Sequence, residues 1–431
     1  MLLGVWLWGF MIWGFMSGTR SSRKLEQACW DQLPYRWLTG WPRPDHHTLW
    51  RLYRDHRQPL RRRLKRTVRT AVAAGLVDLA VQAVDGTRVA GSAARERTLD
   101  AAGLAGLLER TASAIADLEA QNTGGDDPPP PRLPKRLAER PALQEQVQAA
   151  LERVQAEDGP ERTNLTDPDA TLQKGRNGGW LGGYNAQAVV AGVAAPPSGD
   201  PDEPDGLLIT AADVTTDRDD HGQLVPLVDQ AAATTETPLE QVRADGGYHS
   251  TANLAACAEH KPPVALLMPD PQATAAYHKD RCVDDPATDT FTCPQGQTLR
   301  FNGQDRRRDG APTVRRYRAL KTVCDACPVR AACTTSTTKG RSITIGPDDA
   351  RLRQHRAVMA TVAARATYRR RKTLPEPAFG ILKEQQAARR FLLRGLDPVR
   401  AEWTLLATAF NLRTLARAWR STGRLPLPAA A

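Results

Sequence analysis

The stretch Leu79-Ala-Val-Gln-Ala-Val-Asp85-Gly86 is an apolar, β-prone run that ends in a carboxylate and a glycine. Such a run before Asp-Gly is typical of a short buried strand followed by a turn. The sequence therefore predicts a strand over residues 79–84 with Asp85 at its C-terminal end. An isolated Asp-Gly pair is usually only a turn, so Asp85 becomes a candidate site residue only together with other carboxylates.

The segments that follow this strand predict an α/β core. Strand-like patterns cover residues 182–193 and 206–214, and the Pro-, Gly- and Asp-rich stretch between them predicts a hairpin. A helix over residues 222–233 then leads to a strand that ends at Asp245, and residues 264–268 form another short strand.

Changes in composition divide the chain into four predicted regions. The first is a basic helical N-terminal DNA-binding domain (1–78), and the second is the first part of the core (79–269), which includes a helical and Pro-rich spacer (100–160). An irregular cysteine-rich insertion (270–345) and a helical C-terminal part of the core (346–431) follow. In the last region the pattern predicts three helices, over residues 348–368, 379–393 and 400–419.

The N-terminal region combines helical periodicity with dense positive charge. Asp45 follows Pro44 and can cap a helix, and the apolar residues Leu64 and Val68 recur at helical spacing before Gly75. The opposite face of this second helix is rich in arginine. It is either a solvated face or a surface for the DNA backbone.

Residues 1–18 are almost wholly apolar and rich in tryptophan. No positive charge precedes them, so the pattern does not favour a signal peptide. Their length leaves a membrane anchor open, and a buried helix is the preferred interpretation.

The 431 residues suffice for roughly two or three domains. A net charge of +11 and a pI near 9.5 favour a polyanionic partner, most simply double-stranded DNA, over a small-molecule substrate or a membrane.

Three acidic residues lie in contexts that suit a shared metal site: Asp85, Asp245 in Ala-Asp-Gly-Gly-Tyr-His-Ser, and Glu376 in Leu-Pro-Glu-Pro. Two divalent cations about 3.5–4 Å apart can bind the attacking and leaving oxygens of a phosphoryl displacement. Glu376 also lies between Tyr368, Arg371 and Lys383, whose side chains can hold substrate phosphates. A solvated charged face is the alternative.

Four of the seven cysteines cluster as Cys293, Cys324-x2-Cys327 and Cys333. This spacing is typical of a structural zinc site of the zinc-ribbon kind, with reduced thiols in a loop as the alternative. The site would order a basic lobe whose arginines can touch DNA: Arg306, Arg307, Arg308, Arg315 and Arg316.

Two histidines and two amides are weaker candidates. His221 and His249 can be neighbours of an active site, although a single histidine is more often structural. Asn185 and Gln187 point to the same side of their strand, where they either line the site or form packing contacts.

Several segments resemble, in order along nearly the whole chain, those of bacterial insertion-sequence transposases of the DDE class. They are Thr-Arg-Ser-Ser-Arg-Lys-Leu-Glu (19–26), Arg-Pro-Asp-His-His-Thr (43–48), Val-Asp-Gly-Thr-Arg-Val (84–89), Thr-Asp-Pro-Asp-Ala (166–170), Gly-Tyr-Asn-Ala-Gln (183–187), Ala-Asp-Gly-Gly-Tyr (244–248), the Tyr-Arg-Glu-Lys signature (368–383) and Phe-Leu-Leu-Arg-Gly-Leu (391–396).

This resemblance implies a ribonuclease-H-like core and metal-dependent DNA cleavage at element ends, followed by strand transfer into target DNA. It implies Asp85, Asp245 and Glu376 as ligands of two Mg²⁺ or Mn²⁺ ions, and DNA contacts by Tyr368, Arg371 and Lys383. A homodimer that works in the cytoplasm is expected, because two element ends must be paired.

Members of the family usually have further residues before the apolar helix, so the chain looks N-terminally truncated. The alternative function is therefore a catalytically inactive, transposase-derived DNA-binding protein. A metal-dependent nuclease without strand transfer and a membrane-tethered protein also stay open on the sequence.

Overall fold

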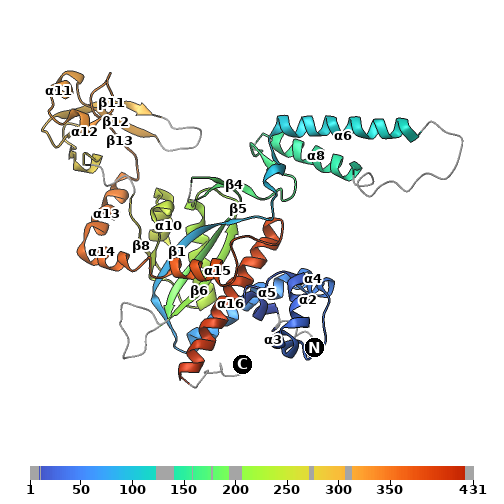
Figure 1. Ribbon diagram of the computed structural model, residues 1–431. Coiled ribbons are helices and arrows are strands. Elements are labelled where there is room, and N and C mark those ends of the chain that lie inside the picture. The colour runs from blue at the N-terminus through green and yellow to red at the C-terminus, as the bar shows by residue number, and fades with distance from the viewer. Residues whose placement is uncertain are drawn as a thin grey trace. The chain divides into compact units, whose positions relative to one another are not determined.

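The computed structural model describes residues 9, 11–122, 140–157, 159–175, 178–193, 206–270, 276–305 and 313–422. The chain forms two compact units, and each consists of stretches that are distant in sequence (Figure 1). The first unit comprises residues 1–220, 227–238 and 373–431, and the second comprises residues 221–226 and 239–372.

The first unit is built on long antiparallel strands. The central strand β5 (Trp180–Val193) pairs with β1 (Val77–Ala90), β6 (Gly206–Thr215) and the short β4 (Thr171–Lys174). The pairing of β5 with β6 confirms the predicted hairpin. The register places Asp85 opposite Ala188 and continues to Ala90 opposite Gly183.

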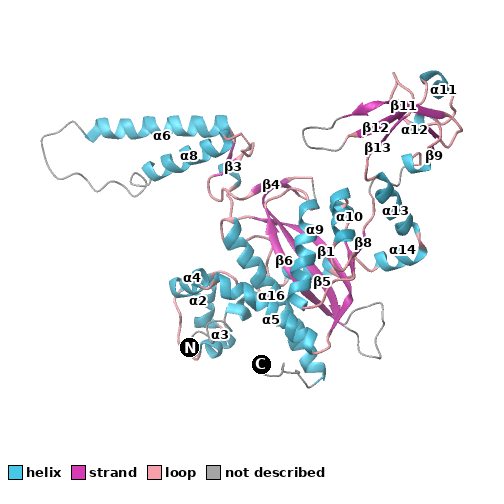
Figure 2. Ribbon diagram, turned by 180° about the vertical axis from the view of Figure 1, so that it is seen from behind, coloured by secondary structure: helices cyan, strands magenta, loops and turns pink. Residues whose placement is uncertain are grey.

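Three helices pack on one face of this sheet and form the main core (Figure 1). They are α5 (Arg57–Ala73), α15 (Pro375–Glu384) and α16 (Leu396–Thr422). Figure 2 shows the same sheet from behind. Trp403 of α16 is fully buried, and its Nε1 donates a hydrogen bond to the carbonyl of Gln187 at 2.9 Å. This bond secures the largest core side chain to the central strand.

The N-terminal region is helical, as predicted. Residues 11–16 are helical and are followed by α2 (Ser22–Asp31), α3 (Leu33–Thr39) and α4 (His46–Asp55). Asp45 caps α4 by accepting the Thr48 N–H at 2.8 Å. Half of the predicted helix 1–18, residues 1–8 and 10, lies outside the described residues. No helix in the described parts of the chain is long and apolar enough to cross a membrane.

The spacer region of the first unit is a pair of helices, α6 (Ala101–Asn122) and α8 (Arg140–Gln155), with a small core of their own around Leu104 and Val147. The short strands β2 (Thr98–Leu99) and β3 (Thr163–Asn164) pair at its base.

The second unit contains the parallel strands β7 (Gln241–Arg243) and β8 (Ala265–Leu267), joined by α10 (Thr251–Glu259). Helix α9 (Leu224–Thr235) contributes its first residues to this unit. A separate antiparallel sheet has the order β13-β12-β11-β10-β9. Its strands are β9 (Val283–Asp285), β10 (Thr290–Thr292), β11 (Thr298–Asp305), β12 (Val314–Arg318) and β13 (Ser342–Ile345), and the remaining helices are α11 (Lys321–Asp325), α12 (Arg330–Cys333), α13 (Asp349–Ala360) and α14 (Val362–Arg369).

Four local predictions were wrong. The strand expected over residues 79–84 runs through Asp85 to Ala90, because the following residues complete their backbone hydrogen bonds with β5. Residues 270–345 are not irregular but contain the five-stranded sheet, whose short polar strands give little periodic signal. The helix expected over 348–368 is two helices, because the side chain of Thr361 caps a second one. The helix expected over 379–393 corresponds to α15, which already starts at Pro375. It ends before Ala387, whose φ of 54° is not compatible with a helix.

Candidate active site

Asp85 lies in the middle of β1 rather than at its end, and its side chain is half-buried. Its Oδ1 accepts the N–H of Gly86 at 2.8 Å, which orients the carboxylate. Because side chains alternate along a strand, Asp85 and Thr87 point to one face of the sheet, and Gly86 and Arg88 point to the other. The face of Asp85 is the one that α15 covers, as the contact of Lys383 with Thr87 demonstrates.

Glu376 lies in the first turn of α15, and its side chain is exposed. Pro375 occupies the start of the helix, where its missing N–H costs nothing. Two turns later, Lys383 Nζ donates to Thr87 Oγ1 at 2.5 Å and to the Arg88 carbonyl at 3.2 Å. These bonds hold the helix of Glu376 against the strand of Asp85. The first unit therefore brings the elements of two predicted ligands together.

Asp245 belongs to the second unit, where it follows β7 after one intervening residue, Ala244. It caps a single helical turn, Gly246–Tyr248, and its Oδ1 accepts the Gly247 N–H at 2.8 Å. The side chain is half-buried, and Tyr248 is fully buried beneath the turn. Asp245 thus has a backbone-held carboxylate like Asp85.

The predicted DNA contacts differ in exposure. Tyr368 near the end of α14 is half-buried, whereas Arg371 is only 7% exposed. Lys383 of the first unit is half-buried, and its ammonium group contacts β1. Phosphate binding by Arg371 would require its side chain to become accessible.

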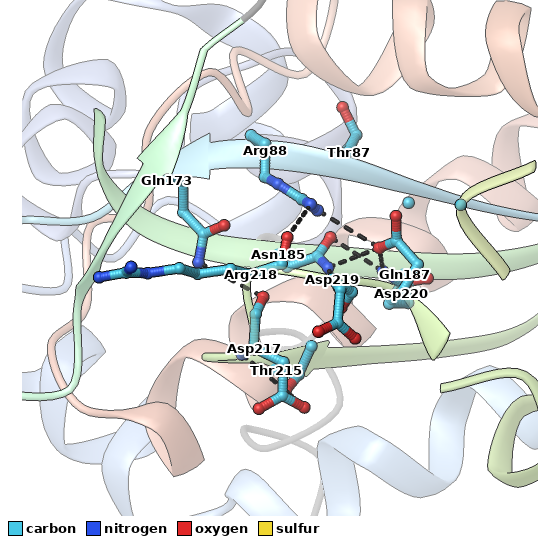
Figure 3. A network of polar contacts seen from close by, with 12 residues as sticks. Thr87, Arg88, Gln173, Asn185, Gln187, Thr215, Asp217, Arg218, Asp219 and Asp220 are labelled. Atoms are coloured by element: carbon cyan, nitrogen blue, oxygen red, sulfur yellow. Dashed lines mark hydrogen bonds and ion pairs between the residues drawn. The ribbon is translucent and has the colours of Figure 1, made fainter. Parts of the chain in front are cut away.

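A polar network lies on the face of the sheet opposite Asp85 (Figure 3). Asp220 Oδ1 accepts hydrogen bonds from Asn185 Nδ2 at 2.6 Å and from Gln187 Nε2 at 2.7 Å, and Arg88 Nη1 lies 3.4 Å away. Asn185 and Gln187 are fully buried, so their predicted common orientation serves this network. Asp220 was missed in the sequence; the acidic run Asp217-Arg-Asp-Asp220 after a strand was the available signal.

Two family models match the chain. A model described as a transposase DDE domain matches residues 292–416, and one described as a transposase domain (DUF772) matches residues 5–55. The two matches indicate an insertion-sequence transposase of the DDE class. No curated protein matches the chain. Glu376, Tyr368, Arg371 and Lys383 lie within the first match.

The cysteine cluster surrounds a cavity in the second unit. Cys293, Cys324, Cys327 and Cys333 all line it, and its volume of about 30 Å³ is sufficient for a water molecule or an ion. Backbone N–H groups of Gln297 and Arg341 donate to the sulfurs of Cys293 and Cys324, each at 3.3 Å. Within the described ranges, however, no three Cys, His, Asp or Glu side chains are arranged to hold a metal ion.

The basic lobe expected around the cysteine cluster is only partly described. Arg315 and Arg316 of β12 form ion pairs with Asp289 and Asp305, so both have protein partners. The predicted contacts Arg306, Arg307 and Arg308 lie outside the described residues.

The two candidate histidines have different surroundings. The carbonyl of His221 accepts the Asn253 side-chain N–H at 2.8 Å, which joins it to α10. His249 Nε2 lies 3.8 Å from Asp270, and burial lowers the pKa of His249 although this carboxylate opposes the shift. Both histidines therefore have structural surroundings in the second unit.

Proposed function

We propose that this transposase cuts DNA at the ends of its element and joins the freed 3′ ends to target DNA. The observation that carries the proposal is the attachment of α15, the helix of Glu376, to β1 beside Asp85 through Lys383 and Thr87. Both steps are in-line displacements at phosphorus, so one site can serve both. The family matches support DNA as the substrate.

Asp85, Asp245 and Glu376 are the proposed metal ligands. Carboxylate oxygens are the donors that Mg²⁺ and Mn²⁺ prefer, and Mg²⁺ needs only one or two of them beside water and phosphate. Their donor chemistry suits this role, and backbone N–H groups orient one oxygen of Asp85 and one of Asp245, while Glu376 is exposed. Within the described residues no three such side chains are arranged to hold a metal ion, so the three carboxylates would have to come together when the ions bind. The chemistry supplied by two bound ions is activation of the attacking oxygen and stabilisation of the leaving oxygen.

Tyr368, Arg371 and Lys383 are the proposed DNA contacts. Two of them carry a positive charge, and phosphate contacts of this kind position a duplex without reading its sequence. In the free protein Lys383 contacts Thr87, so a phosphate would share its ammonium group or replace that bond. The exposed arginines of α5, such as Arg62 and Arg66, extend the proposed DNA surface of the N-terminal region.

We propose a ribonuclease-H-like core for this protein. Three long antiparallel strands with helices on one face of the sheet in the first unit, and a parallel β-α-β segment in the second, are consistent with it. A homodimer that pairs two element ends in the cytoplasm is the proposed working form.

A structural Zn²⁺ held by the four clustered cysteines is proposed for the second unit. Thiolates are soft ligands that suit Zn²⁺, and backbone N–H groups already point at two of the sulfurs. Because no metal-binding arrangement is preformed in the described residues, the sulfurs would have to move toward the cavity centre on binding.

The test is cleavage of a labelled duplex that carries the terminal repeat flanking the gene, in the presence of Mg²⁺. Wild type is compared with D85A, D245A and E376A, and with the control D213A, which removes a half-buried carboxylate that pairs with Arg400. The proposal expects cleavage that only the first three substitutions abolish.

Three different results would each contradict part of the proposal. Binding of the duplex without cleavage by wild type would favour the inactive DNA-binding protein. Cleavage that survives D245A would show that this residue is not a metal ligand. Cleavage without joining to a target plasmid would favour a nuclease.

A further inference from the structure

We infer that Asp220 is a positioning residue, which fixes strand β1 beside Asp85 and thereby supports metal binding. This inference rests on the proposed function, since it assigns Asp85 as a metal ligand. Asp220 ends the segment that follows β6, and it is the last residue of the first unit before the chain enters the second at His221.

Asp220 connects this segment to two strands. Its Oδ1 accepts from Asn185 and Gln187 of β5 at 2.6 and 2.7 Å, and it forms an ion pair with Arg88 of β1 at 3.4 Å. Arg88 also donates through Nη2 to the carbonyl of Arg218 at 2.6 Å. Figure 3 shows these groups converging on Asp220. The segment is therefore attached to β1 and β5 at several points.

The network lies directly against the backbone of Gly86. A Cβ atom at this position would lie 2.5 Å from Gln187 Nε2 and 2.8 Å from Asp220 Oδ1. Both distances are shorter than normal Cβ contacts, so any side chain at this position would displace the ends of Gln187 and Asp220. Glycine next to Asp85 therefore lets the network lie directly against the strand.

Strand β1 is consequently held on both faces near Asp85. On one face, Asp220 and its partners enclose Gly86 and bind Arg88. On the other, Lys383 binds Thr87. A carboxylate on a backbone fixed in this way keeps its direction toward a metal ion, and loss of such outer support typically weakens metal affinity about 10–100-fold.

Asp220 itself is not placed to contact DNA or to hold the proposed ions. Its side chain is only 17% exposed, and its position on the face opposite Asp85 separates it from the Asp85 carboxylate. Loss of Asp220 should therefore change metal affinity without changing DNA affinity. If the network serves only fold stability, loss of Asp220 should change neither the metal affinity nor the DNA affinity at temperatures where the variant is folded.

The experiment measures Mn²⁺ binding to the full-length protein by electron paramagnetic resonance, and the Mg²⁺ concentration for half-maximal cleavage of the end duplex. The variants are D220A, D220N and G86A, with D213N as the control from the neighbouring strand. D220N keeps an acceptor oxygen for Asn185 and Gln187. G86A removes no polar group and displaces the network from the strand.

In D220A and G86A, we expect the Mn²⁺ concentration for half-maximal binding and the Mg²⁺ concentration for half-maximal cleavage each to increase about tenfold or more. The Kd for the duplex should stay unchanged. D220N should lie closer to wild type, and D213N should equal it. If D220A does not fold, G86A and D220N carry the comparison.

The inference would be overturned if G86A keeps the metal affinity of wild type and a folded Asp220 variant (D220A, or D220N if D220A does not fold) keeps it as well. A change in stability alone would not rescue the inference. A wild type that binds Mn²⁺ but does not cut would remove the proposed reaction, while the Mn²⁺ comparison still decides the role of Asp220. A wild type that binds no Mn²⁺ would overturn both.

Discussion

Lys383 and Thr87 are 296 residues apart in the sequence, and their side chains form a hydrogen bond of 2.5 Å. Thr87 lies two residues after Asp85 on the same face of β1, and Lys383 lies two helical turns after Glu376 on α15. This contact fixes the register between the strand of one proposed ligand and the helix of another. A shift of α15 by one turn would move Glu376 by about 5.4 Å.

Replacing Lys383 by methionine should therefore loosen α15. The variant loses the hydrogen bonds to Thr87 and to the Arg88 carbonyl, and a hydrogen bond to a charged group contributes about 1.5–3 kcal/mol. We expect a loss of about that size in the free energy of unfolding, measured in urea, and slower cleavage. The control is K65M on the exposed side of α5.

DNA binding by the same variant separates the two roles of Lys383. If Lys383 also contacts a phosphate, the slope of log Kd against log salt should decrease by about one in K383M. Equal stability of K383M and K65M would contradict the structural role of the bond.

The buried ion pair between Arg20 and Glu402 should be far more important for stability than surface pairs. Arg20 Nη1 lies 2.6 Å from Glu402 Oε1, and both side chains are almost completely buried. The pair joins the N-terminal region to α16, and Glu402 also accepts the N–H groups of Leu392 and Leu393 in the segment before this helix. Removing one partner leaves a buried charge uncompensated.

We expect R20M to lower the free energy of unfolding of the first unit by about 3–5 kcal/mol. The matched control is R54M, since Arg54 forms an exposed, solvent-screened pair with Asp55 that should contribute little to stability. Similar losses in both variants, measured by chemical denaturation, would show that burial of the first pair has no special effect.

Local signals in the sequence predicted the elements best. The Asp45 cap and the β5–β6 hairpin were correct, because capping and hairpin formation depend on neighbouring residues. The extent of β1 could not be predicted, because Asp85-Gly86 has the local signature of a turn and only pairing with β5 makes it a strand. Long-range pairing thus overrode the local preference.

The same limit applies to the candidate site. Asn185 and Gln187 could be placed on one face from strand alternation, but their partner Asp220 follows the next strand and has no periodic signal of its own. The role of Lys383 also depends on a residue far away, Thr87. Charge and motif suggested a DNA contact for Lys383, whereas only the tertiary structure shows its bond to β1.

The cysteine lobe should contain about one Zn²⁺ per chain when the protein is purified without chelators. Substituting Cys324 by serine should reduce the zinc content, measured by plasma mass spectrometry, and destabilise the second unit. The control is C29A, which removes a buried thiol of the first unit whose pKa burial raises to about 11. Zinc-free wild type with unchanged stability after chelation would contradict the prediction.

Acid should destabilise the second unit, because burial lowers the pKa of His249, His278 and His355 below the ordinary value of 6.5. The unfolded chain then takes up protons at a higher pH than the folded chain. The stabilisation is complete above about pH 6.5 and declines as the pH falls toward the folded pKa values. We therefore expect the Tm of the second unit to fall between about pH 7 and 5.

His355 is the best position for testing this pH dependence. Its Nε2 contacts the Leu266 carbonyl at 3.1 Å, and its ring centre lies 6.0 Å from that of His249, whose positive charge would oppose protonation of His355. Glutamine at this position keeps an N–H donor for Leu266 but cannot be protonated. H355Q should therefore show a shallower decrease of Tm with falling pH than wild type, whereas H47Q on the exposed surface of α4 should not. Parallel Tm curves for H355Q and wild type would mean that protonation of His355 does not drive the acid destabilisation.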